Sequence, residues 1–197
     1  MKQLIWRHRQ RPSPSRYFIS FLLLALALIS ARVSGQEVVQ RKAGESTENF
    51  VGRVLPPKTE LAHKVLIGSF GPSSNNILLL FRPELDSSNY TGWVLMPQDK
   101  SFSSYQKVVL PPMEEIPRHF DITVSSVLYA NADKDKELEL IVLYEYYRTG
   151  SGTDTGNAAY VYDWSGREFV ILDKIGMKLV GLKSGAAVRR KLKALGY

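Results

Sequence analysis

The chain has 197 residues, no cysteine and a formal net charge of +7. This length favours one domain with a sizeable core, and the lack of cysteine excludes disulfide cross-links and thiol chemistry. The positive charge lies at the two ends, because residues 36–173 hold 13 basic and 19 acidic residues, a net charge of −6. A body of that charge repels nucleic-acid phosphates, so no nucleic-acid partner is expected.

Residues 1–35 have the layout of a secretory signal peptide. A basic, acid-free start ends at Arg16, and 15 uncharged residues follow, from Tyr17 to Ala31. Small residues come next and suit cleavage after Gly35. The uncharged run is shorter than the ~20 residues that cross a bilayer. We therefore expect a secreted or periplasmic protein, with an uncleaved signal anchor in the membrane as the alternative.

Residues 36–60 are polar and contain a double proline, so we predict a linker or a mobile first turn there. The β domain is predicted over residues 61–197. Within it, two segments of similar layout cover residues 63–110 and residues 122–172. In each, one strand ends in a polar loop, a strongly apolar strand follows, and a hairpin completes four strands. In the second segment, a turn over residues 163–166 makes the last hairpin. The sequence thus predicts two similar units of about 50 residues.

The C-terminal residues 184–195 are predicted to form an amphipathic helix. Ser184 suits the N-cap and Gly196 is a stop signal. Three large apolar residues recur at helical spacing: Val188, Leu192 and Leu195. We expect this apolar stripe to dock on the sheets, and a membrane-surface or partner-binding helix is the alternative. The predicted fold is all-β with a C-terminal helix: two four-stranded antiparallel sheets packed together in a monomer.

An acidic loop, residues 131–138, leads directly into an apolar strand of the second unit. Its polar side chains fall at alternate positions, as on a strand of a sheet that is packed on one face. Calcium takes six to eight oxygen ligands, and a short loop supplies them through alternate carboxylates and a backbone carbonyl. The predicted ligands are the side chains of Asn131, Asp133, Asp135 and Glu139, and the Glu137 backbone carbonyl. The alternative is a solvated turn in which Asn131 and Asp133 hydrogen-bond their own backbone.

The acidic loop does not fit an EF-hand, because Lys136 stands where that motif needs glycine and strands flank the loop. The stretch from Val124 to Leu172, including the closing YDWSGREFVIL, instead resembles the FG-GAP and VCBS-type repeats of integrin-α-type propellers. Their pattern is D-x-D-x-D-G-x-x-D-L. The resemblance covers the first unit only in layout, and that unit's loop GPSSNN has no acids.

The resemblance implies four-stranded blades with calcium in the loop between the first two strands. By position, the ligands would be Asn131, Asp133, Asp135 and Glu139. The sequence departs from the repeat pattern where Asn131 replaces the first acid, Lys136 the glycine and Glu139 the last aspartate. Two blades cannot close a propeller ring. The sheets are therefore expected to pack face to face, pair with a second chain or be covered by the C-terminal helix.

Catalytic motifs are absent from the sequence: G-x-S-x-G, the P-loop and H-E-x-x-H do not occur. We therefore interpret the chain as an exported, non-catalytic binding or structural module, stabilised by calcium. Its partner would be a protein or glycan in the envelope or outside the cell. The alternative is a glycan-binding protein or a hydrolase that uses the loop Gly150–Asn157 and a Tyr-rich face. The tyrosines of that face are Tyr144, Tyr146, Tyr147, Tyr160 and Tyr162.

Overall fold

The computed structural model describes residues 37–83, 90–113, 120–148 and 155–197. The predicted signal peptide lies outside the described residues, and so does most of the loop Gly150–Asn157. Among the residues that are described, no helix is both long and apolar enough to cross a bilayer.

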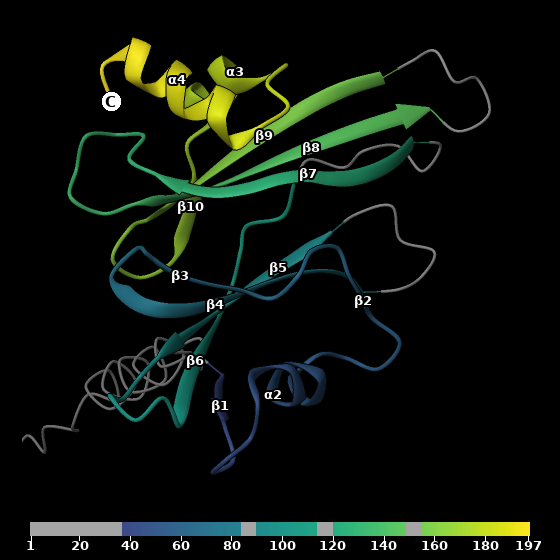
Figure 1. Cartoon of the computed structure of the whole chain (residues 1–197), viewed down its shortest axis with the longest axis vertical. Helices are drawn as coiled ribbons and strands as arrows, with labels where there is room; N and C mark the ends of the chain where they lie inside the picture. Colours follow the sequence, from purple (N-terminus) through teal and green to yellow (C-terminus); the bar gives the residue numbers. More distant parts are fainter. Residues whose placement is uncertain (1–36, 84–89, 114–119, 149–154) are drawn as a thin grey trace, which may run out of the picture. The chain divides into compact units, whose positions relative to one another are not determined.

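The first sheet contains the predicted meander of four strands, extended by two short ones (Figure 1). The meander consists of β3 (Leu66–Phe70), β4 (Ser73–Arg82), β5 (Thr91–Pro97) and β6 (Ser104–Val109). Antiparallel pairing adds β1 (Val38–Gln40) beside β6 and β2 (Glu60–Leu61) beside β4.

Residues 36–60 differ from the predicted linker, because they contain β1, the helix α2 (Thr47–Val54) and the start of β2. The Ser46 hydroxyl caps α2 by accepting a hydrogen bond from the Asn49 N–H at 3.2 Å. Phe50 and Val51 are buried against the first sheet. Burial of a large apolar side chain contributes ~1.5–3 kcal/mol. Two such side chains therefore order a segment whose composition is otherwise polar.

The second sheet is a four-stranded antiparallel meander in the order β10-β9-β8-β7. Its strands are β7 (Phe120–Ala130), β8 (Glu139–Arg148), β9 (Thr155–Trp164) and β10 (Phe169–Ile171). Two helices follow, α3 (Asp173–Leu179) and α4 (Gly185–Leu195). The fold class predicted from the sequence is thus confirmed: a mostly β protein with two antiparallel sheets packed together and a C-terminal helix.

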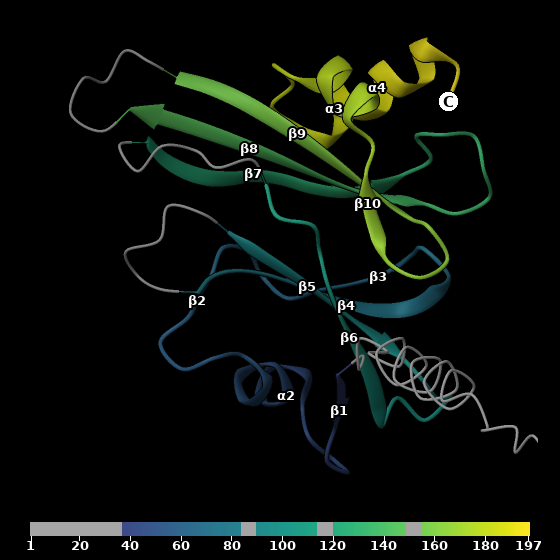
Figure 2. The ribbon, with the colours of Figure 1, turned by 180° about the vertical axis from the view of Figure 1, so that it is seen from behind.

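Successive side chains of β4 point to opposite faces of the first sheet. Both of these faces are buried. Leu78 and Leu80 belong to the core that the two sheets share. Ile77, Leu79 and Phe81 belong to a separate core that includes α2. Figure 2 shows α2 on the side of the first sheet that faces away from the second.

The second sheet is built in the same way around β8. Leu140 and Val142 enter the core between the sheets, whereas Ile141 and Leu143 pack under α3 and α4. Alternate side chains of β8 are therefore buried on opposite faces of the second sheet. The sequence pattern predicted a sheet packed on one face only. The cause of the difference is the pair of C-terminal helices, which cover the outer face (Figure 1).

The predicted C-terminal helix is confirmed. Ser184 caps α4 by accepting from the Ala187 N–H at 3.3 Å, and Gly196 ends it in the left-handed region at φ 85°. Val188 and Leu192 are buried in the core between the second sheet and the helices α3 and α4. The apolar stripe thus docks on the protein, as expected, rather than facing a membrane surface.

The two sheets are also joined by polar and aromatic contacts. The Gly71 N–H donates to the Leu138 carbonyl at 3.0 Å, and the Arg82 guanidinium donates to the Ile122 carbonyl at 2.8 Å. The Phe70 ring stacks on Tyr129 of β7 with centroids 4.6 Å apart. The β3–β4 turn therefore lies against the end of the acidic loop.

Candidate metal centre

The acidic loop connects β7 to β8 and is closed by hydrogen bonds to its own backbone. The Asn131 side chain accepts from the Lys134 N–H at 2.9 Å and donates to the Asp135 carbonyl. One oxygen of Asp133 accepts from the Asp135 N–H at 3.0 Å, and one oxygen of Asp135 accepts from the Glu137 N–H at 2.7 Å. These are the bonds expected for a polar turn. They leave one oxygen of each aspartate for other partners.

Glu139 is the first residue of β8, and only 1% of its surface is exposed. Its Oε2 accepts a hydrogen bond from the Ala132 N–H. Its Oε1 is buried and has no hydrogen-bond partner among the described residues. A buried carboxylate that lacks a partner costs several kcal/mol unless it binds a proton or a cation.

Asp163 reaches the same place from β9. Tyr162 pairs with Leu140 across the β8–β9 ladder, so the next residues, Asp163 and Glu139, are neighbours on adjacent strands. Carboxylate oxygens of Asp133, Glu139 and Asp163 all lie within 4.8 Å of one another. Asp163 is not among the ligands predicted from the sequence, because the sequence pattern places this residue in a hairpin turn. The signal that could have found it is the register of the β8–β9 hairpin.

The electrostatics of this acidic centre (Asp133, Glu139 and Asp163) favour a bound positive charge. Burial is the main cause that raises the pKa of Glu139 to about 7; the bond from the Ala132 N–H lowers this pKa, and the charges of the neighbouring aspartates raise it. Burial is also the main cause that raises the pKa of Asp163. No lysine or arginine in the described part of the chain forms an ion pair with the three carboxyl groups.

Glu137 adds a fourth carboxyl group beside the acidic centre. Its Oε2 is buried and has no hydrogen-bond partner within the described ranges. Burial, followed by the charge of Asp135, raises the pKa of this side chain as well. The region therefore concentrates negative charge, and no ion pair among the described residues neutralises it.

The donor set suits a hard divalent cation. Calcium binds carboxylate oxygens at 2.3–2.6 Å, so two ligands of one ion lie at most about 5 Å apart, which the spacing within the acidic centre satisfies. Of the predicted ligands, this centre includes Asp133 and Glu139, whereas both polar atoms of the Asn131 side chain are engaged in the turn. Asp135 and the Glu137 backbone carbonyl stay predicted ligands. Three carboxylates do not distinguish calcium from magnesium.

The tyrosines of the Tyr-rich strands differ in their exposure. Tyr144 and Tyr162 are buried in the core between the sheets, and Tyr160 meets Tyr144 edge to face at 5.7 Å. Tyr147 is exposed. These rings therefore act mainly as packing between the strands.

Comparison of the chain with family models, curated proteins and solved structures gives no significant match. The class of the protein follows from its fold and its site alone. It is a two-sheet β protein with helices on both outer faces and an acidic centre at the start of β8 in the second sheet.

Proposed function

We propose that this protein is an exported, non-catalytic binding or structural module whose second sheet is stabilised by a divalent cation, with calcium as the leading ion. The observation that supports this most directly is the buried Glu139 carboxylate, whose Oε1 lacks a hydrogen-bond partner among the described residues. Its carboxyl oxygens lie beside those of Asp133 and Asp163.

A cation at the acidic centre would join three segments that are separate in the sequence: the acidic loop, the start of β8 and the end of β9. Such an ion binds the folded chain and not the unfolded one. Stability then increases by RT ln(1 + [L]/Kd), or ~2.7 kcal/mol at a hundredfold excess over Kd. We expect weak binding, with Kd of ~10⁻⁴–10⁻³ M, the range of extracellular calcium modules.

The resemblance to FG-GAP and VCBS-type repeats supports this proposal through position. Those repeats hold calcium between the first two strands of a four-stranded unit, and the acidic loop occupies that place between β7 and β8. The corresponding segment of the first sheet, residues 71–76, comprises the β3–β4 turn and the start of β4 and has no acids. We therefore propose one cation per chain, and a protein or glycan as the partner of the module.

The decisive experiment is thermal and urea denaturation of residues 36–197 in chelator, in calcium and in magnesium. Millimolar calcium should stabilise the wild type by ~2–3 kcal/mol. Asp133→Asn/Asp163→Asn should lose this response, because two of the three carboxylates are gone. Asp→Asn keeps the oxygen that accepts the turn bond from Asp135.

Glu168→Gln is the matched control, because Glu168 is an exposed acid of the β9–β10 turn outside the acidic centre. This variant should respond to calcium like the wild type. A wild type that melts at the same temperature in calcium and in chelator would refute the cation site. A response to both ions would assign a divalent site without selectivity for calcium.

The exported location rests on residues 1–35 and has its own test. Expression of the full chain in a secreting host, followed by N-terminal sequencing of the product outside the cytoplasm, should give a chain that begins at Gln36. Recovery of the intact chain in the membrane fraction would instead support the signal-anchored alternative.

A further inference from the structure

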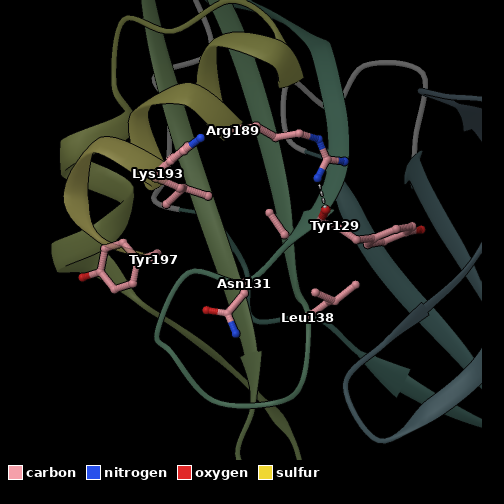
Figure 3. A pocket seen from close by; sticks show the side chains of 8 residues that line it. Tyr129, Asn131, Leu138, Arg189, Lys193 and Tyr197 are labelled. Atoms are coloured by element: carbon pink, nitrogen blue, oxygen red, sulfur yellow. Dashed lines mark hydrogen bonds between the residues drawn. The ribbon is translucent and has the colours of Figure 1, made fainter.

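A pocket of about 300 Å³ lies between α4, the end of β7 and the acidic loop (Figure 3). Its apolar lining comes from Ala130, Leu138, Leu192 and the ring of Tyr197. Leu138 is 40% exposed although it is a large apolar residue. This volume matches a small organic molecule rather than a single ion or water.

The charged side chains that line the pocket are both cations, Arg189 and Lys193, and no carboxylate lines it. One nitrogen of Arg189, Nη1, donates to the Tyr129 carbonyl at 2.9 Å, as Figure 3 shows, and this bond holds the guanidinium at the pocket wall. The remaining N–H groups of the guanidinium have no hydrogen-bond partner within the described ranges and are left for a ligand.

The Lys193 ammonium makes no hydrogen bond and no ion pair with any residue that the structure describes. A third cation lies close by, because the Lys134 ammonium is 5.5 Å from the centre of the Tyr197 ring. Residues 36–173 carry a net charge of −6. Arg189 and Lys193 instead belong to the basic C-terminal end, residues 174–197, which holds seven basic residues and no acid, and a pocket lined by these cations favours an anionic ligand.

We propose that this pocket binds a small organic carboxylate with an apolar body. The carboxylate would accept hydrogen bonds from Arg189 and Lys193, and the apolar body would lie on Leu138 and Tyr197. An inorganic anion would use the two cations but leave the apolar wall unoccupied. This binding site is additional to the proposed cation and does not depend on it.

The test is a calorimetric titration of 3-phenylpropionate into residues 36–197, with the neutral 3-phenylpropan-1-ol as the comparison ligand. The acid should bind at least about fivefold more tightly than the alcohol, because a charge-assisted hydrogen bond is stronger than a neutral one. Lys193→Gln should weaken binding of the acid about fivefold. Lys191→Gln should leave it unchanged, since Lys191 is exposed on the same helix but does not line the pocket.

Two further ligands identify the source of the carboxylate. N-acetylglycyl-phenylalanine represents the C-terminus of a polypeptide. The corresponding C-terminal amide has the same structure without the negative charge. Binding of this acid but not its amide would support the proposal with a polypeptide terminus as the ligand. Binding of 3-phenylpropionate alone would support it with a small free acid.

Three results would overturn the proposal. The first is the absence of saturable binding of either acid. The second is an equal loss of affinity in Lys191→Gln and Lys193→Gln. The third is an equal affinity for inorganic sulfate, because such a result would show a plain counter-ion effect. The titrations should be run in calcium and in chelator, and saturable binding in either solution supports the pocket. The calcium melts test the acidic centre separately, so the two proposals fail independently.

Discussion

Each of the two sheets has a buried polar residue near the start of a central strand. The hydrogen bonds of these two residues differ. In the first sheet, Asn76 of β4 is fully buried, and its Nδ2 donates to the carbonyls of Phe70 and Ser73 at 2.7 and 3.0 Å. In the second sheet, Glu139 of β8 accepts one N–H bond and leaves one carboxyl oxygen without a partner among the described residues.

The first turn therefore needs no partner from solution, whereas the second turn needs a proton or a cation. The Asn76 Oδ1 is also buried without a described partner, but a neutral amide oxygen costs far less to bury than a carboxylate. The first turn should therefore be indifferent to pH and to ions. The second should respond to both, because Glu139 must be protonated or bound to a cation.

The largest effect is expected from Asn76→Asp, which gives the first turn the charge of the second. The new carboxylate would lose both donated bonds and face two carbonyl oxygens in a buried site. We expect the free energy of unfolding at pH 8 to decrease by ~3–5 kcal/mol, the cost of an unpaired buried charge. Urea denaturation measures this.

Asn75→Asp is the control for that variant, since Asn75 is the exposed neighbour and should tolerate the change within ~0.5 kcal/mol. If Asn76→Asp also stays within this range, the two turns differ less than their buried side chains indicate.

The next effect is a pH dependence in the presence of chelator. The Glu139 pKa in the folded protein is about 7, above its ordinary value of 4.5. The folded state then holds this proton more tightly than the unfolded state does. The resulting stabilisation is complete below pH 4.5 and is lost as the pH rises through about 7, by at most ~3 kcal/mol.

Urea denaturation from pH 4 to pH 8 in chelator measures this loss. Glu139→Gln should flatten the profile, because its amide stays neutral and can still accept from the Ala132 N–H. Saturating calcium should reduce the loss at high pH in the wild type, since the ion favours the ionised carboxylates. An identical pH profile for the wild type and Glu139→Gln would contradict the assignment.

The smallest effect concerns backbone strain in the two turns. Lys134 of the acidic loop has φ 79° and Asn75 of the first turn has φ 59°, both in the left-handed region. Asparagine adopts this region at a lower energetic cost than lysine does. We expect Lys134→Gly to raise the free energy of unfolding by ~0.5–1 kcal/mol and Asn75→Gly to change it by a few tenths.

Chelator should be present in these melts, because Lys134→Gly also removes a cation from the acidic loop and should tighten calcium binding. Equal changes in the two glycine variants would mean that the strain at Lys134 is relieved in some other way.

Most of the strands could be predicted because apolar runs alternate with clear turn residues. Two helices could not. The helix α2 depends on the tertiary burial of Phe50 and Val51 in a polar segment. In α3, Gly176 is a poor helix former, yet an added Cβ would approach the Ala159 carbonyl to 2.5 Å. The glycine is needed for close packing on β9.

The acidic centre could be predicted only in part, because one of its three carboxylates depends on the pairing of strands. Asp133 and Glu139 lie within one loop and its following strand, so their spacing in the sequence indicated an ion site. Asp163 joins them only through the pairing of β8 with β9. Register between strands depends on the whole hairpin, including turns that a local pattern does not define.

The pairing of β1 with β6 has a consequence for the order of folding. Val38 lies opposite Gln106, whereas each sheet's central meander joins strands that are consecutive in the chain. Hairpins between neighbouring strands form in ~1–10 μs, and closing a longer chain segment carries a larger entropic cost. The two meanders can therefore assemble first, as separate nuclei. The strand β1 attaches once β6 is in place, so it joins the first sheet after the meander has formed.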